Sequence, residues 1–193
     1  MAEHANNKDS VAKYQAFLAL IGETSQQRVI ELYNQYKGSF MGYLLGLQIP
    51  RPMPDLKSQS PQEPDSAIWQ RSFAYYRSHY FDGFPLDNDY VLCSEDYAIR
   101  IESYVNRGLG TNADTIKKYL MILLDSTESN ANVFRFTLSK VFAIYSAGNT
   151  QAYNNVYVFL AQKYYLNNRA PWVNQQYILQ LKESLEQKKQ DGS

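Results

Sequence analysis

The stretch Ser94–Gly108, SEDYAIRIESYVNRG, repeats its apolar residues with the spacing of an amphipathic helix. The apolar side chains that fall on one face are Tyr97, Ala98, Ile101, Tyr104 and Val105. Ser94 is suited to the N-cap, because a serine hydroxyl can accept a hydrogen bond from the first free amides of a helix. Gly108 is suited to the stop, because glycine readily takes the left-handed conformation that ends many helices. The stretch therefore predicts one helix between these two residues.

The same spacing recurs through most of the chain and predicts eight further helices. One of them is expected to begin at TSQQ, Thr24–Gln27, and another at Thr111 in the capping pattern TNAD. The residues expected to face inward include Val11, Tyr14, Leu18, Ile21, Val29, Tyr33, Tyr36, Trp69, Phe73, Tyr76, Tyr80, Phe134, Leu138, Val141, Phe142, Tyr145, Tyr177, Ile178, Leu181 and Leu185. No alternating strand pattern of convincing length occurs. The predicted fold class is all-α, an irregular multi-helix bundle of about nine helices with no significant sheet.

A proline-rich connector interrupts the helical pattern at Pro50–Pro64, which holds five of the seven prolines. Proline fixes φ and removes a backbone donor, so this segment is expected to be extended. The predicted organisation is N-terminal helices over 1–49, the connector over 50–64 and a main helical bundle over 65–193, together one structural domain. The connector either separates the N-terminal helices from the bundle or lies across it as a strap. No 34-residue tetratricopeptide repeat is visible, and a non-repeating stack of helix pairs stays open.

The overall charge argues against nucleic acid as a partner, and the hydropathy argues against a transmembrane segment in this chain. Nineteen basic residues balance nineteen acidic ones among 193 residues, so the chain has no net attraction to a phosphate backbone. Nucleic acid is therefore not expected as a partner. No run is long and apolar enough for a membrane span, so no transmembrane segment is predicted in this chain.

The best candidate for reactive chemistry is the stretch Tyr75–Cys93, which holds the single cysteine and His79. One hypothesis makes Cys93 a nucleophile with His79 as its base, since a catalytic cysteine needs help to form a thiolate. The favoured interpretation is a small packed residue at a helix start and an interfacial histidine bonded to a carbonyl or to water. The aspartates of this stretch lack the spacing of a calcium loop and suit turns and caps.

The other short motifs lack the structural context or the companion residues that their chemistry requires. GLGTNA, Gly108–Ala113, loosely matches a dinucleotide fingerprint, but a helix rather than a strand precedes it, so it is interpreted as a turn between helices. The two histidines lie far apart in the sequence, without a metal-hydrolase pattern. The sequence therefore predicts no catalytic residue, no metal site and no cofactor, and the protein is not expected to be an enzyme.

Aromatic residues make up 15% of the chain and supply the candidate binding residues. Aromatic side chains carry much of the energy of protein interfaces. The turn Ala161–Asn174, AQKYYLNNRAPWVN, and the end of the stretch around YFD supply them. The candidate partner-binding residues are Tyr80, Phe81, Asp82, Tyr164, Tyr165 and Trp172. The alternative for Trp172 is a plug at the end of the bundle.

Four phrases, in this order and spacing, carry a family resemblance: YYRSHYFDGFPLDNDYVL, YAIRIESYVNRG, NVFRFTLSKVFAIYS and VYVFLAQKYYLNNRAPWVN. They resemble a helical domain of unknown function catalogued as family 5106, over roughly Gln26–Gln187. That domain precedes the thioredoxin-like domain of TlpA-type thiol-disulfide oxidoreductases. The chain departs from the pattern at YVLCSE, Tyr90–Glu95, where relatives have an arginine and a threonine-proline pair. Any role tied to that arginine does not carry over.

The resemblance implies an all-α accessory domain in the periplasm, or more generally outside the cytoplasm. Its expected partner is a thioredoxin-like domain in cis or in trans, which would hold the redox-active CxxC that this chain lacks. The leading expectation is a non-catalytic helical accessory or interaction domain. The alternatives are a small-ligand or peptide-binding helical domain and a thiol enzyme that uses Cys93.

Overall fold

The computed structural model describes residues 8–50 and 53–191. Within these ranges it contains nine α-helices and no strand, so the predicted all-α fold class is confirmed. The helices are α1 (Lys8–Gln35), α2 (Phe40–Leu47), α3 (Leu56–Gln59), α4 (Asp65–His79), α5 (Asp96–Ser103), α6 (Ala113–Thr127), α7 (Ala131–Ala147), α8 (Gln151–Leu160) and α9 (Gln175–Asp191). No described helix combines the length and the apolarity that crossing a membrane requires.

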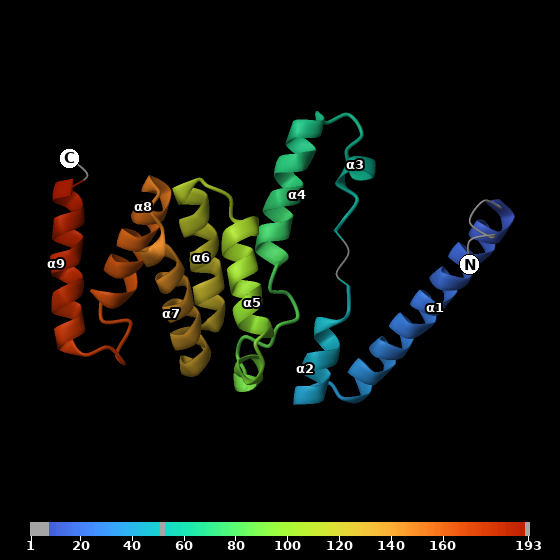
Figure 1. Ribbon diagram of the computed structural model, residues 1–193, viewed down its shortest axis with the longest axis horizontal. Coiled ribbons are helices and arrows are strands. Elements are labelled where there is room, and N and C mark those ends of the chain that lie inside the picture. The colour runs from blue at the N-terminus through green and yellow to red at the C-terminus, as the bar shows by residue number, and fades with distance from the viewer. Residues whose placement is uncertain (1–7, 51–52, 192–193) are drawn as a thin grey trace. The chain divides into compact units, whose positions relative to one another are not determined.

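The chain divides into two compact units (Figure 1). Unit 1 comprises the residues up to Pro52 together with Gly83–Pro85, and unit 2 comprises Met53–Asp82 and the residues from Leu86 onward. The division falls inside the proline-rich segment, of which residues 51 and 52 lie outside the described part of the chain. The terminal residues 1–7 and 192–193 of the predicted segments lie outside it as well.

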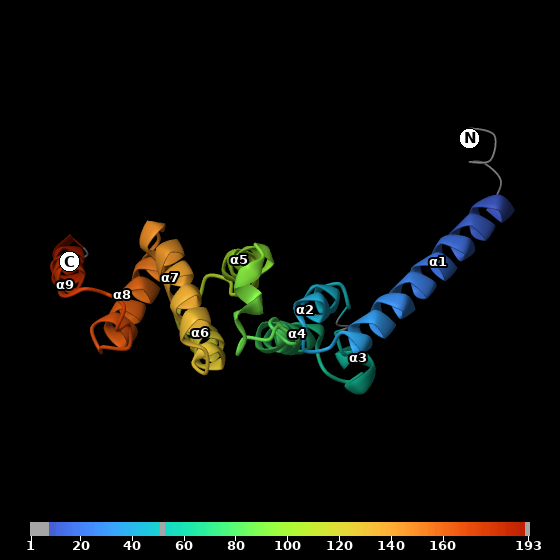
Figure 2. The ribbon, with the colours of Figure 1, turned by 90° about the horizontal axis from the view of Figure 1, so that it is seen from below.

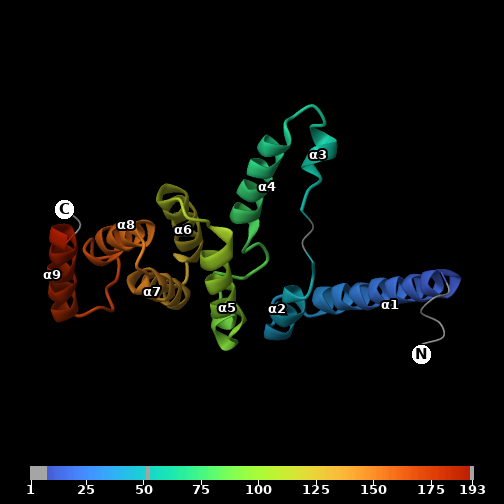
Figure 3. The ribbon, with the colours of Figure 1, turned by 45° about the horizontal axis from the view of Figure 1, so that its top comes forward.

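Unit 1 is built on one long helix, α1, where the sequence analysis expected two. The predicted N-cap at Thr24 is wrong, because the Thr24 hydroxyl donates to the Leu20 carbonyl at 2.8 Å inside a continuous helix. Ser39 caps α2 and accepts from the Gly42 amide at 3.1 Å. The helix α2 packs on α1 so closely that a Cβ at Gly46 would lie 3.1 Å from the ring of Tyr33. Figure 3 shows α2 at the C-terminal end of the straight helix α1.

In unit 2, contacts join every second helix from α4 to α8. The helix α6 contacts α4 and α8 as well as its sequence neighbour α7, and α5 contacts α7. Contacts between every second helix are those of a stack of helix pairs, which was one of the open alternatives. Figures 1 and 2 show α4 to α9 following one another in chain order.

The core of unit 2 is filled by tyrosines as much as by leucines. Its fully buried large side chains include Tyr97, Tyr104, Tyr145, Tyr164, Leu120, Leu124, Leu138 and Leu160. The hydroxyl of Tyr97 lies 2.6 Å from the buried Thr137 hydroxyl, which in turn donates to the Val133 carbonyl at 2.7 Å. The hydroxyl of Tyr104 donates to the Arg77 carbonyl at 2.7 Å. Large rings with a polar end thus fill the wide spaces between helices, which accounts for the aromatic composition.

Two helices of unit 2 end in π-helical turns. The helix α5 continues into Tyr104–Gly108, and α8 continues into Ala161–Tyr165. The turns close with bonds from the Leu109 amide to the Tyr104 carbonyl at 3.1 Å and from the Leu166 amide to the Ala161 carbonyl at 2.9 Å. Such wide turns are rare and often lie at functional sites.

The predicted caps of the Ser94–Gly108 helix and its successor are corrected by the structure. Asp89–Cys93 forms a 3₁₀ turn, and Ser94 is the extended residue after it, so Ser94 is not the N-cap of α5. The helix α6 is capped by Asn112, whose side chain accepts from the Thr115 amide at 2.9 Å, and not by Thr111. GLGTNA is the turn between the two helices, as predicted.

Several apolar side chains expected in the core are exposed. Trp69 and Phe73 on α4 are 64% and 46% exposed, and the expectation that they face inward is wrong. The same expectation is wrong for Val11, Tyr14, Leu18 and Ile21 on α1, for Tyr36 directly after it and for Tyr177 on α9. An apolar stripe predicts a helix, but it does not specify which part of the stripe another element covers.

Candidate functional site

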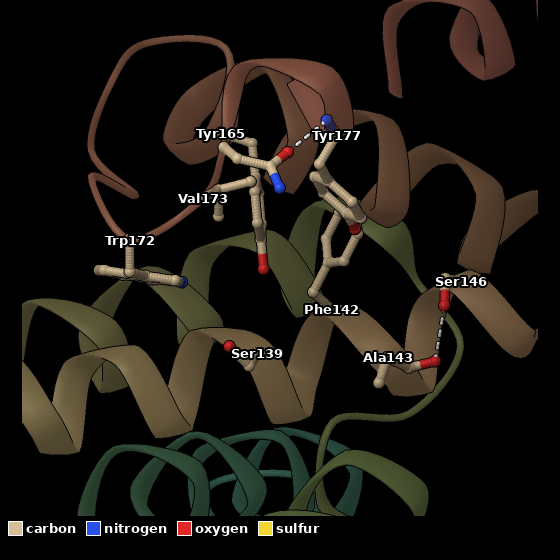
Figure 4. A pocket seen from close by; sticks show the side chains of 9 residues that line it. Ser139, Phe142, Ala143, Ser146, Tyr165, Trp172, Val173 and Tyr177 are labelled. Atoms are coloured by element: carbon tan, nitrogen blue, oxygen red, sulfur yellow. Dashed lines mark hydrogen bonds between the residues drawn. The ribbon is translucent and has the colours of Figure 1, made fainter. Parts of the chain in front are cut away.

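An open groove of about 440 Å³ lies between α7 and the segment that leads into α9 (Figure 4). From α7 it is lined by Ser139, Phe142, Ala143 and Ser146. From the segment after α8 it is lined by Tyr165, Trp172, Val173, Asn174 and Tyr177. We call these nine residues the α7 groove. All of them belong to unit 2.

The floor of the α7 groove consists of packed aromatic rings. The ring of Tyr165 lies 4.4 Å from that of Phe142 and 6.2 Å from that of Tyr177, measured between centroids. Figure 4 shows the hydroxyl of Tyr165 pointing toward α7, where Ser139 lies. Burial raises the pKa of the Tyr165 hydroxyl, Tyr177 raises it further, and a hydrogen bond with Ser139 lowers it. The groove therefore combines aromatic rings with the polar side chains of Ser139, Ser146 and Asn174, and Tyr165 stays neutral.

The segment that closes the groove is fixed by hydrogen bonds from backbone amides and by an ion pair. The Arg169 amide donates to the Tyr164 carbonyl at 2.9 Å, just after the π-helical turn. The Asn174 side chain accepts from the Tyr177 amide at 2.8 Å and so begins α9. The guanidinium of Arg169 lies 4.8 Å from the Tyr164 ring centroid and forms an ion pair with Glu128. These contacts hold Trp172 and Val173 over α7.

A second depression of about 550 Å³ borders the α7 groove. Its lining residues are Asp89, Leu92, Cys93, Asn132, Arg135, Phe136 and Ser139. Ser139 lines both depressions, so they run along neighbouring stretches of α7. The guanidinium of Arg135 lies 6.0 Å from the Trp172 ring centroid. Together the depressions present rings, a cation and a thiol.

Cys93 lies in the second depression and is exposed, so its expected role as a packed residue is wrong. The 3₁₀ turn Asp89–Cys93 buries Val91 completely and leaves Cys93 outside. Its Sγ lies 3.6 Å from the Asp89 carbonyl oxygen. His79 has a different partner: its Nδ1 lies 2.8 Å from an Asp82 carboxylate oxygen, and its ring lies 4.1 Å from that of Tyr75.

We expect the Cys93 thiol to react with one equivalent of an aromatic disulfide reagent in the folded protein, because its side chain is exposed. His79→Ala should leave the rate unchanged, because the ring of His79 is paired with Asp82. Release of the coloured thiol measures the rate, and the denatured protein gives the reference stoichiometry. A reaction that needs denaturant, or a marked loss of rate in His79→Ala, would contradict this.

The structure separates the six predicted partner-binding residues. Trp172, half-buried, and Tyr165, 5% exposed, line the α7 groove together, whereas Tyr164 is 0% exposed and offers no surface to a partner in this conformation. Trp172 also packs edge-on against Phe134 at 5.9 Å, so its predicted plugging role and its place in the groove are compatible.

Tyr80, Phe81 and Asp82 follow α4 and lie outside both depressions. The half-buried ring of Tyr80 lies 4.8 Å from that of Tyr104, and the guanidinium of Arg100 lies 4.5 Å from it. Arg100 Nη2 also donates to the Tyr80 carbonyl at 2.7 Å. Phe81 packs at 5.0 Å against Tyr104, and of the three residues only Asp82, paired with His79, is exposed. This cluster fastens the end of α4 to α5.

Ser139 and Ala143 of the α7 groove and Arg135 of the second depression were not predicted as site residues. Ser139, Ala143 and Ser146 recur at intervals of four and three along α7, which is a face of small residues beside the buried stripe. That spacing was the available signal. The partner wall, about thirty residues further along the chain, gives no local signal that it lies opposite.

No set of three or more His, Cys, Asp or Glu side chains among the described residues could hold a metal ion. The protein is thus an all-α stack of helices with an open groove, lined in part by aromatic rings, along one face of α7. No family model, no curated protein and no solved structure matches this chain. The resemblance to family 5106 therefore stays a prediction.

Proposed function

We propose that the protein is a non-catalytic helical interaction domain that binds a segment of a partner protein along α7. The observation that carries the proposal is the α7 groove, where Phe142, Tyr165, Trp172 and Tyr177 gather beside Arg135. Tryptophan, tyrosine and arginine are the residues enriched at energetic centres of protein interfaces.

The form of the two depressions favours an extended occupant over a compact one. Sites for small molecules enclose most of the ligand surface in one cavity. Here two open depressions of about 440 and 550 Å³ meet at Ser139, along one helix face. A peptide segment can lie across both, with side chains in each, and this supports the peptide-binding form of the proposal.

The resemblance alone supplies the identity of the partner. It leads us to propose a thioredoxin-like domain of a TlpA-type oxidoreductase, in cis or in trans, and a periplasmic location. In that arrangement the redox chemistry belongs to the CxxC of the partner, and this chain positions that domain or its client.

We expect Ala143→Glu to weaken binding of a TlpA-type thioredoxin-like domain by at least about tenfold, measured by calorimetry with the full chain. Ala143 is exposed on the groove side of α7, so a glutamate there fills the groove and places a charge against its rings. Ala74→Glu is the matched control, because Ala74 is exposed within α4 and lines neither depression.

Two outcomes would contradict the proposal. Failure of the wild-type chain to bind the domain at high micromolar concentration would contradict the proposed partner. Equal binding by both variants would place the partner away from the α7 groove. Far-UV circular dichroism of the variants establishes that both are folded.

A second candidate function, a thiol enzyme, is favoured only by the exposure of Cys93 within the second depression. Exposed thiols are open to alkylation and to disulfide exchange. The dependence of the labelling rate on His79, tested above, separates this function from the binding domain.

A further inference from the structure

Helix α1 carries an apolar stripe along its length, with Leu20 and Ile30 exposed outside it, and only the C-terminal part of the stripe is covered within unit 1. The helix has 28 residues, about 42 Å at 1.5 Å per residue, whereas α2 has eight, about 12 Å. The helix α2 packs at Tyr33, and the neighbouring Val29 and Leu32 are half-buried. The stripe that α2 covers thus continues toward the N-terminus without cover from α2 (Figure 3).

The uncovered part of the stripe exposes five large side chains. They are Val11 (38%), Tyr14 (60%), Phe17 (59%), Leu18 (66%) and Ile21 (46%). At 100° per residue these positions fall on the same face as Val29 and Leu32. The residues between Lys13 and Glu23 carry no charge, so this face can meet an identical one without repulsion.

An uncovered helix of this composition gains little from its own sequence. Isolated helices are marginal in water, and most helical stability in proteins comes from packing an apolar face. Gly22 lies within α1 and costs roughly 0.5–1 kcal/mol relative to alanine. Packing the exposed stripe against another apolar surface would therefore stabilise α1.

We propose that this face pairs with the same face of a second copy of the chain, as an antiparallel helix dimer. About half of each of these side chains is exposed, so at about 150–250 Å² per large side chain the five residues of two copies offer roughly 1,000 Å², near the lower limit for a specific interface. The antiparallel arrangement opposes the two helix dipoles and leaves the α2-covered ends apart.

The charges of α1 favour this occupant over a membrane surface. Helices that lie on membranes carry a polar face rich in lysine and arginine. On α1, Lys13 and Arg28 are balanced by Glu23 and Glu31, and Arg28 is paired with Glu31 at 2.9 Å. Because α1 has no excess positive charge, it is not attracted electrostatically to anionic lipids, and this favours a protein as the occupant of its apolar face.

The test follows the mass and the helicity of the full chain together over low to high micromolar concentration. Sedimentation should show a doubling of the 22.3 kDa mass, with helicity rising in parallel. Leu18→Glu should weaken the dimer by at least about 100-fold, because the substitution occurs twice in one interface. Ala16→Glu, exposed on the opposite face of α1, should leave the dimer unchanged.

Cross-linking tests the direction of pairing in a Cys93→Ser background. An antiparallel register places Val11 against Ile21 and Tyr14 against Leu18 of the other copy. Mixed Tyr14→Cys and Leu18→Cys chains should therefore form a disulfide faster than either chain alone. A monomer at every concentration, equal effects of the two glutamate variants, or vesicle binding with no dimer would overturn the proposal. None of these outcomes bears on the α7 groove.

Discussion

Raising the pH above about 10 is expected to unfold unit 2 cooperatively, because its core depends on neutral tyrosines. Burial raises the pKa of the Tyr104, Tyr145, Tyr164 and Tyr165 hydroxyls far above their ordinary value. Above about pH 10 the unfolded chain releases these protons and the folded chain holds them, so stability falls as the pH rises toward the folded values.

The expected loss is large relative to the stability of a domain. Each tyrosine removes up to about 1.4 kcal/mol per pH unit, so four remove up to about 5 kcal/mol within one unit. Whole domains are stable by about 5–15 kcal/mol. Tyrosinate absorbance and circular dichroism should therefore change together in one steep transition.

Tyr145→Phe is the informative variant for the alkaline transition. The buried Tyr145 hydroxyl has no hydrogen-bond partner within the described part of the chain, so its removal costs little at neutral pH. The transition should shift to higher pH in this variant and stay in place in Tyr14→Phe, where the ring is 60% exposed. Gradual ionisation near pH 10 without loss of helix would contradict the prediction.

Leu120→Ala is expected to destabilise unit 2 by about 2–5 kcal/mol. Leu120 is fully buried on α6, the helix that contacts α4, α7 and α8. Truncation leaves a cavity where three helices meet, and close packing allows only partial relaxation. Urea unfolding measures the loss as a shift of the midpoint.

Ile122→Ala on the same helix supplies the control. Its side chain is 44% exposed, so the loss should stay below about 1 kcal/mol. Equal losses in the two variants would mean that α6 is not packed on the face that the structure gives it.

The helices of unit 2 could be predicted from the sequence because the apolar residues that recur with helical spacing there are also the residues that the fold buries. Ile101, Leu120, Leu138 and Leu160 recur on faces that are fully buried in the structure. The first helix shows the limit, because Val11 and Leu18 follow the same period and are exposed. Periodicity reports which face is apolar, and only the folded chain decides what covers that face.

Helix starts and the groove were harder to predict for different reasons. Ser94 has a suitable side chain for an N-cap, but it is the extended residue that ends the 3₁₀ turn Asp89–Cys93, and Glu95 holds the N-cap position of α5. The α7 groove joins Ala143 to Trp172 and Tyr177, which lie far apart in the sequence. Tyr165 and Trp172 could be predicted as groove residues because aromatic side chains are evident in the local sequence. That α7 forms the opposite wall could not be predicted, because no local pattern links the two segments.

The π-helical turn at Ala161–Tyr165 sets the direction in which the Tyr165 ring leaves the helix, and so decides whether that ring packs on Phe142. An ordinary α-helical turn holds one residue fewer, and each residue advances the direction of a side chain by about 100°. Shortening this turn by a single residue would rotate everything that follows it, and the ring of Tyr165 would swing away from Phe142. The shape of the α7 groove thus depends on one extra residue in a helical turn as well as on the side chains that line it.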